Sequence, residues 1–155
     1  MHPHPIGRDD YQYPYGGLLQ VDGVLTDNEI KNPEQLDAGG KRCRIVCKNG
    51  RTSGTTFGRL SGLESFVRSY PEYGIEGTSI ELAVYSYSNE DGAFSTRGDS
   101  GSIVVDYHGR IAGLLVGGAE GVNSKTDVTY LTPYWWIERQ MKLTYPNISL
   151  YPVVA

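Results

Sequence analysis

Short apolar segments recur at intervals of about ten residues from Lys41 onward, and glycine-containing turn signals separate them. Segments this short favour strands over helices, and the 20 glycines and 12 tyrosines support that reading because they suit turns and half-buried sheet surfaces. The predicted strands cover residues 43–48, 52–60, 64–70, 79–87, 101–107, 110–117 and 128–131. We therefore predict a mainly β fold, an antiparallel barrel or sandwich of six or seven strands, in which closure removes exposed edges.

Two dipeptides mark the clearest turns between these segments. Asn49-Gly50 lies between two strand-like runs, and His108-Gly109 separates two further ones. An Asn-Gly pair is a strong hairpin signal because both central residues of a type I′ turn need a positive φ. The sequence thus predicts antiparallel hairpins at both places.

The regions outside the strands read differently. Residues 1–40 contain four of the eight prolines and one short apolar stretch, so we predict an extended N-terminal arm followed by a barrel domain over 41–155. Thr26 and Glu29 have the spacing of a capping box, which predicts one or two helical turns from Asp27.

A helix is expected at the C-terminal side of the barrel. Thr132-Pro133-Tyr134 offers a capping hydroxyl and a proline at the first helical position, and the helix is expected to reach about Leu143. The pair Trp135-Trp136 is interpreted as core anchors of this closing helix in preference to a ligand site.

Composition and charge exclude several function classes. The 14 basic and 18 acidic residues give a net charge of −4 with no basic cluster, so nucleic acid is not an expected partner. No apolar run approaches the roughly 20 residues of a membrane-spanning helix, so a membrane is not expected either. The first residues lack the apolar core of a signal peptide, which predicts a cytoplasmic protein. Cys43 and Cys47 would lie about 13 Å apart along one strand, too far for a disulfide, and no cluster has metal-ligand spacing. We expect free thiols, no metal and no cofactor.

The sharpest chemical signal is the tetrapeptide Gly98-Asp99-Ser100-Gly101. A reactive serine needs a tight turn, and glycine at position 98 allows the backbone N–H groups of Gly98 and Ser100 to point at one spot where an oxyanion would form. The alternative is an ordinary polar turn, because Gly, Asp and Ser are common turn residues. The context of the tetrapeptide, a strand and a hairpin directly after the serine, decides between the two.

With that context, residues 41–143 resemble the second barrel of trypsin-like (chymotrypsin-fold) serine proteases, and they are similar to uncharacterised fungal proteins with a trypsin-like domain. A strand after the serine also differs from the helix that follows an α/β-hydrolase nucleophile. The resemblance implies that Ser100 is the nucleophile and that the N–H groups of Gly98 and Ser100 form the oxyanion hole. Asp99 is expected to hold the turn.

The resemblance also assigns substrate-binding positions, and these are Phe94, Val116, Gly117 and Gly118. Phe94 falls at the floor of the family's primary specificity pocket. Because a phenylalanine there has no charge, the pocket should not prefer basic side chains. The other three fall where the substrate backbone would pair as an added strand.

The chain departs from the family in lacking a recognisable catalytic His and Asp, which the family takes from its first barrel. His2 and His4 lie in the proline-rich arm, and His108 is predicted at a hairpin tip about 25 Å from Ser100. Two hypotheses follow. The chain is the C-terminal half of a serine endopeptidase whose base comes from an upstream barrel or a separate chain. Alternatively, it is a non-catalytic pseudo-protease barrel that binds a peptide, a protein or another copy of itself.

Overall fold

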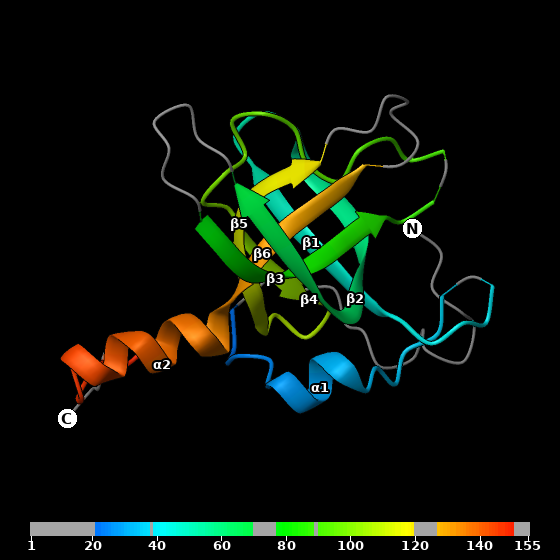
Figure 1. Ribbon diagram of the computed structural model, residues 1–155. Coiled ribbons are helices and arrows are strands. Elements are labelled where there is room, and N and C mark those ends of the chain that lie inside the picture. Colours follow the sequence, from blue (N-terminus) through cyan, green and yellow to red (C-terminus); the bar gives the residue numbers. More distant parts are fainter. Residues whose placement is uncertain (1–20, 38, 70–76, 89, 120–126, 151–155) are drawn as a thin grey trace.

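The computed structural model describes residues 21–37, 39–69, 77–88, 90–119 and 127–150. Its core is a closed, antiparallel six-stranded barrel followed by a helix, which confirms the predicted fold class (Figure 1). The strands are β1 (Arg44–Gly50), β2 (Gly54–Ser69), β3 (Gly77–Ser86), β4 (Ile103–Asp106), β5 (Ile111–Ala119) and β6 (Val128–Pro133). The helices are α1 (Asp27–Lys31) and α2 (Tyr134–Thr144).

The barrel closes in the order β1-β2-β3-β6-β5-β4, and β1 pairs with β4 through Val46 opposite Asp106. Alternate residues point inward, so the apolar positions of every strand meet in one core. Its fully buried members include Val46, Val84, Phe94, Val104, Ala112 and Leu131. Cys43 is buried and Cys47 half-buried, and both are free thiols, as predicted.

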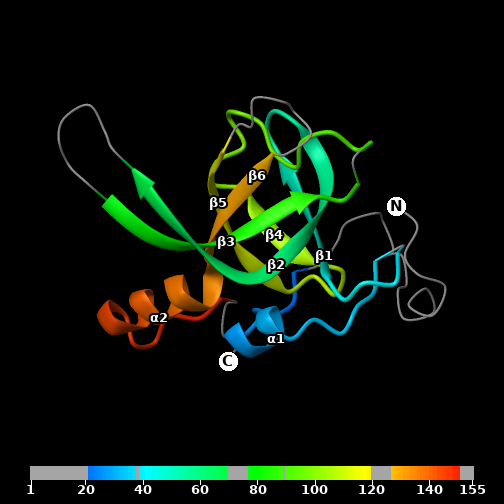
Figure 2. The same cartoon turned by 45° about the vertical axis from the view of Figure 1, so that its right-hand side comes forward.

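β2 and β3 form the longest hairpin of the molecule's described part. The sequence predicted two strands over residues 52–70, but the structure has a single strand, Gly54–Ser69, with a bulge between Leu60 and Glu64. A bulge bends a strand without ending its pairing. The outer half of the hairpin therefore extends beyond the barrel (Figure 2).

The turn predicted at Asn49-Gly50 is wrong by two residues. Both residues belong to β1, and the chain reverses over Arg51, Thr52 and Ser53 before Gly54 takes a positive φ of 63°. A short loop that is closed by a left-handed glycine at its C-terminal side is another common hairpin connection. The turn predicted at His108-Gly109 is confirmed, with Gly109 at φ 80°.

The described part of the predicted arm packs closely on the barrel. Thr26 accepts a hydrogen bond from the Glu29 backbone N–H and Glu29 accepts one from the Thr26 N–H, so the predicted capping box is confirmed. Leu25 and Ile30 are buried in the barrel core, and Val24 bridges to Ile111 of β5. Residues 21–37 thus complete the barrel's hydrophobic core.

α2 leaves the barrel directly from β6. The expected Thr132 cap is not formed, because Thr132 pairs with Leu114 within the sheet and Pro133 is the N-cap without a side-chain hydrogen bond. Trp135 packs against the core, as predicted for an anchor, but Trp136 is 46% exposed. Neither described helix is long and apolar enough to cross a membrane.

Candidate active site

The segment 96–102 forms a tight turn at one end of the barrel, before β4. Gly98 and Gly101 have φ angles of 101° and 86°, which L side chains rarely adopt. The Gly101 N–H donates to the Leu115 carbonyl at 2.7 Å, and the Leu115 N–H donates to the Ser102 carbonyl at 3.0 Å. The sequence therefore places glycines where this turn needs positive φ, and β5 holds the turn in place.

Three groups of this turn are free to meet a ligand. Ser100 and Gly98 are exposed, and within the described part of the chain neither of their backbone N–H groups donates a hydrogen bond. The Ser100 hydroxyl likewise has no hydrogen-bond partner among the described residues. Unused backbone N–H donors are groups that can bind an anionic oxygen of a ligand.

Asp99 points the other way, into the protein, and its side chain is fully buried. Its carboxylate accepts hydrogen bonds from the backbone N–H groups of Thr52 (2.8 Å), Ser53 (3.2 Å) and Thr96 (3.0 Å), and from the Ser53 hydroxyl. Burial by itself would raise the pKa of Asp99, but these hydrogen bonds outweigh it and hold the pKa well below its usual range. Asp99 therefore holds the turn as an anion.

Lys48 of β1 completes this buried anchor. Its ammonium lies 3.3 Å from the Asp99 carboxylate, donates to the Ser53 hydroxyl at 2.6 Å and to the Gly54 carbonyl at 3.1 Å, and is fully buried. It also lies 5.7 Å from the centre of the Phe94 ring. Sequence reasoning missed Lys48, although a lysine at an inward-facing position of a strand, two residues after Val46, was a usable signal.

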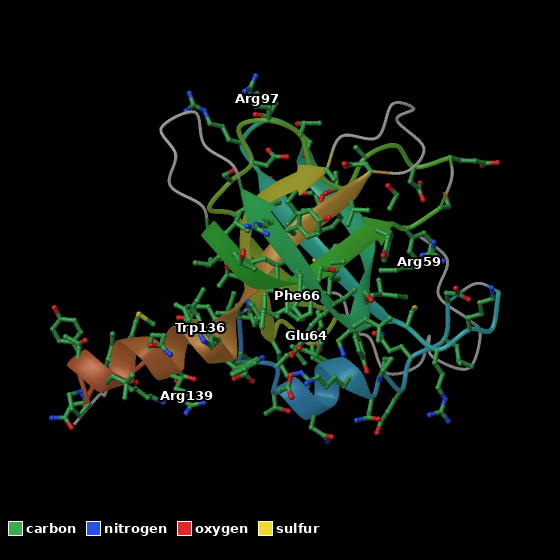
Figure 3. The ribbon with its side chains drawn as sticks, viewed as in Figure 1. Arg59, Glu64, Phe66, Arg97, Trp136 and Arg139 are labelled. Carbon is green, nitrogen blue, oxygen red and sulfur yellow. The ribbon has the colours of Figure 1, made fainter. Side chains whose placement is uncertain are left out.

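A cavity of about 450 Å³ opens beside Ser100. Its lining residues come from the turn and the residue before it, from β5 and from the residue that precedes β6. They are Ser95, Thr96, Arg97, Gly98, Ser100, Leu115, Gly117, Gly118 and Asp127. Figure 3 shows Arg97 on the loop at this end of the barrel. A pocket of this size next to a free hydroxyl can accept one side chain of a bound peptide.

The structure brings only part of the predicted substrate-binding set to this cavity. Gly117 and Gly118 line it, whereas Val116 is 48% exposed and lies outside the lining. Phe94 is 1% exposed and belongs to the core, where it packs beneath the turn near Lys48. The prediction that the pocket does not prefer basic side chains was based on Phe94, which does not line the cavity. The sequence analysis did not identify Asp127, an acidic residue that does line it.

No histidine of the described residues lies at the Ser100 turn. His108 is exposed at the β4–β5 turn, the opposite end of β4, where it contacts Tyr107. His2 and His4 lie outside the described residues. Across the described ranges, no group of three or more His, Cys, Asp or Glu side chains could hold a metal ion. The turn thus presents an exposed serine hydroxyl and two unused N–H donors, and no histidine of the described residues lies beside them.

No protein-family model matches this chain, and no curated protein matches it. Among solved structures, it is similar to Cellulomonas bogoriensis chymotrypsin, with 22% identity and a TM-score of 0.52 over 85% of this chain and 56% of that chain. It is also similar to the passenger domain of the plasmid-encoded toxin, an autotransporter enterotoxin of enteroaggregative Escherichia coli. That match has 18% identity and a TM-score of 0.51 over 80% of this chain and 15% of that one.

These likenesses define the class of fold. The protein has a chymotrypsin-like fold: mainly β, with a six-stranded antiparallel closed sheet and a C-terminal helix. Because both matched structures are less than 25% identical to this chain, the similarities establish its fold and nothing further. The chain spans just over half the length of the chymotrypsin that it matches.

Proposed function

We propose that this chain is the nucleophile-bearing half of a chymotrypsin-fold serine endopeptidase. Ser100 attacks the peptide carbonyl, and the N–H groups of Gly98 and Ser100 bind the resulting oxyanion. The observation that carries the proposal is the pair of unused N–H donors next to an exposed hydroxyl and a 450 Å³ cavity. The buried Lys48–Asp99 pair supports it by holding the turn in that conformation.

The general base and its orienting carboxylate come from elsewhere under this proposal. An upstream barrel or a separate chain supplies them, because no histidine of the described residues lies near Ser100. The substrate is a peptide or protein with one side chain in the cavity. The similarity to fungal trypsin-like-domain proteins and the cytoplasmic location remain predictions from the sequence.

Chemical rescue tests the proposal directly. A fluorophosphonate probe is incubated with the purified chain in rising concentrations of imidazole, which replaces the missing base, and adducts are located by mass spectrometry. We expect an adduct on Ser100 that forms faster with imidazole. Ser100→Ala should abolish it, and Ser79→Ala, an exposed serine far from the turn, should leave it unchanged. Gly98→Ala should also abolish it, because an added Cβ would overlap the Thr52 hydroxyl and distort the turn.

A second function is favoured by the same observation, that no histidine of the described residues lies near Ser100. A non-catalytic barrel would use the cavity to bind a peptide, a protein or another copy without cleaving it. The absence of a Ser100 adduct at every imidazole concentration, in a chain shown to be folded by circular dichroism, would contradict the peptidase proposal and support this one. Removing a triad member typically lowers turnover by about ten-thousand-fold or more, so the two functions are separable by rate.

A further inference from the structure

A second cavity of about 350 Å³ lies between β3 and the start of α2, at the end of the barrel away from Ser100. We call it the tryptophan cavity, after Trp135 and Trp136, and its other chemically informative lining residues are Asp27, Glu64, Ile80 and Glu81. It shares no lining residue with the cavity beside Ser100. Figure 3 shows Glu64 and Trp136 toward the helices and Arg97 at the other end of the barrel.

The charge of the tryptophan cavity is unbalanced. Its described lining contains three carboxylates and no basic side chain. Asp27 and Glu64 share one cation, the Lys31 ammonium, at 2.9 and 3.4 Å, and that ammonium is 44% exposed. Three acids with one basic neighbour leave a net negative site. A cationic ligand would be drawn to it.

Within this acidic lining, Glu81 is the carboxylate that most needs a positively charged partner. This residue is only 5% exposed, and its Oε2 atom has no hydrogen-bond partner among the described residues. Nor does it form an ion pair within the same ranges. A buried carboxylate without a partner is costly, and a cation bound beside it would remove that cost. The buried, unpaired carboxylate of Glu81 therefore indicates a ligand with a positively charged group.

The remaining walls suit the stem of a long basic side chain. An indole face attracts a Lys or Arg head group, and the aliphatic part of such a side chain packs on apolar surface. Trp136 is 46% and Ile80 50% exposed, so both offer that surface to a ligand. The Trp135 Nε1 atom is buried and has no acceptor within the described residues, so it can donate to a ligand carbonyl.

The strand edge beside the cavity suits an extended peptide. β3 pairs with β2 along its whole length, but its pairing with β6 begins only at Leu82. From Gly77 to Glu81 the other edge of β3 has no strand partner in the described part of the chain. Extended peptides bind such edges by adding a strand, and their side chains then enter neighbouring pockets.

We propose that the tryptophan cavity binds a basic, extended segment of a partner protein. The segment adds to the free edge of β3 at residues 77–81, and one Lys or Arg side chain enters the cavity toward Glu81, between the indoles. Glu64 and Asp27 attract the same segment at the cavity mouth. This site is independent of Ser100 and of the peptidase proposal.

Tryptophan fluorescence tests this proposal, because the chain contains two tryptophans and both line the cavity. The probe is an end-blocked six-residue threonine peptide with one central arginine, and the control peptide carries the neutral isostere citrulline. We expect a saturable fluorescence change with arginine and at least tenfold weaker binding of the citrulline peptide. Glu81→Gln should weaken arginine binding at least tenfold, whereas Ser100→Ala and the surface control Glu34→Gln should not.

A second variant guards against misfolding of Glu81→Gln. Glu64→Gln changes an exposed carboxylate, so it should fold normally and still weaken binding severalfold, with a shallower dependence on salt. Equal binding of the arginine and citrulline peptides would overturn the proposal, as would undiminished binding in both glutamate variants. A fluorescence change that tracks protein concentration without peptide would assign the surface to a second copy of this chain and overturn the proposal equally.

Discussion

Lys48 and Asp99 face each other across the barrel end, and their side chains are both fully buried. A buried ion pair is worth keeping only when further hydrogen bonds satisfy both partners. Here Ser53 and Gly54 satisfy the ammonium, while Thr52, Ser53 and Thr96 satisfy the carboxylate. These contacts join the β1–β2 loop to the Ser100 turn. The turn therefore depends on a residue 51 positions earlier in the chain.

Acid should weaken this anchor in a defined range. Because the pKa of Asp99 is depressed in the folded state, its contribution to stability is full above its unfolded value of about 3.8 and is lost as pH falls below it toward the folded value. We expect the free energy of unfolding, measured with urea from pH 7 to 3, to fall more steeply below pH 4 in the wild type than in Lys48→Met/Asp99→Asn. Parallel pH profiles would contradict this role.

The single variant Lys48→Met supplies the matched comparison. It leaves the Asp99 charge buried without its cation, which typically costs about 3–5 kcal/mol. The double variant should be more stable than this single one, because no uncompensated charge remains. A single variant as stable as the double would mean that the Asp99 charge costs nothing without its cation, which would contradict the role of Lys48 in this anchor.

At the scale of elements, α1 is stabilised by its N-terminal capping box and is held on the barrel by an ion pair between Glu29 and Arg110. The carboxylate of Glu29 accepts from the Thr26 N–H at 3.0 Å and from its hydroxyl at 2.7 Å, and it pairs with Arg110. Arg110 also pairs with the buried Asp106 carboxylate at 2.7 Å, which Arg44 of β1 approaches at 3.4 Å. A five-residue helix is too short to be stable by itself, so these contacts hold it.

Removing the cap hydroxyl tests that attachment. Hydrogen bonds from the Thr26 backbone and side chain, followed by the charge of Arg110, lower the pKa of Glu29 to about 2. Thr26→Ala removes the hydroxyl but keeps the backbone N–H, so it should raise that pKa part of the way toward 4.5 in an NMR titration and cost about 1 kcal/mol of unfolding free energy. Thr26→Ser keeps the hydroxyl and should change neither value. A pKa that stays near 2 in Thr26→Ala would show that the backbone N–H of residue 26 and Arg110 set it without the hydroxyl.

For the whole molecule, the core of the closed barrel includes side chains from a segment outside its strands. Leu25 is 0% and Ile30 1% exposed, and both join the core formed by the strands. The Leu25 N–H donates to the Ile111 carbonyl at 2.9 Å, and the Ile111 N–H donates to the Gly23 carbonyl at 3.0 Å. Residues 21–37 should therefore unfold together with the barrel.

Leu25→Ala tests whether residues 21–37 and the barrel unfold as one cooperative unit. Truncating a fully buried leucine typically costs about 2–5 kcal/mol through lost burial and the cavity left behind. We expect the urea midpoint of the entire barrel to fall, with circular dichroism and tryptophan fluorescence giving one coincident transition. A barrel transition at the wild-type midpoint would instead support a separate arm ending near residue 40. Leu143→Ala, at an exposed position of α2, is the size-matched control.

Features that depend on near neighbours in the chain could be predicted from the sequence. Strand spacing predicted the barrel, the Thr26–Glu29 pair predicted the start of α1, and the Gly98–Gly101 tetrapeptide predicted the serine turn, because backbone conformation and capping are local. The exact position of the β1–β2 turn depends instead on contacts between distant segments. The turn lies where the N–H groups of Thr52 and Ser53 reach Asp99, and a Cβ on Gly50 would overlap that carboxylate.

The positions of Phe94 and of the tryptophan cavity also depend on contacts between distant segments. Phe94 lies in the core and does not form the floor of a pocket. Its ring is buried beneath the Ser100 turn by residues of β1, β2 and β3, which come earlier in the chain. The tryptophan cavity joins α1, β2, β3 and α2, and no local pattern could have placed Glu81 beside two indoles. Such sites depend on which distant segments the closed barrel brings together, and that is settled by packing rather than by spacing along the chain.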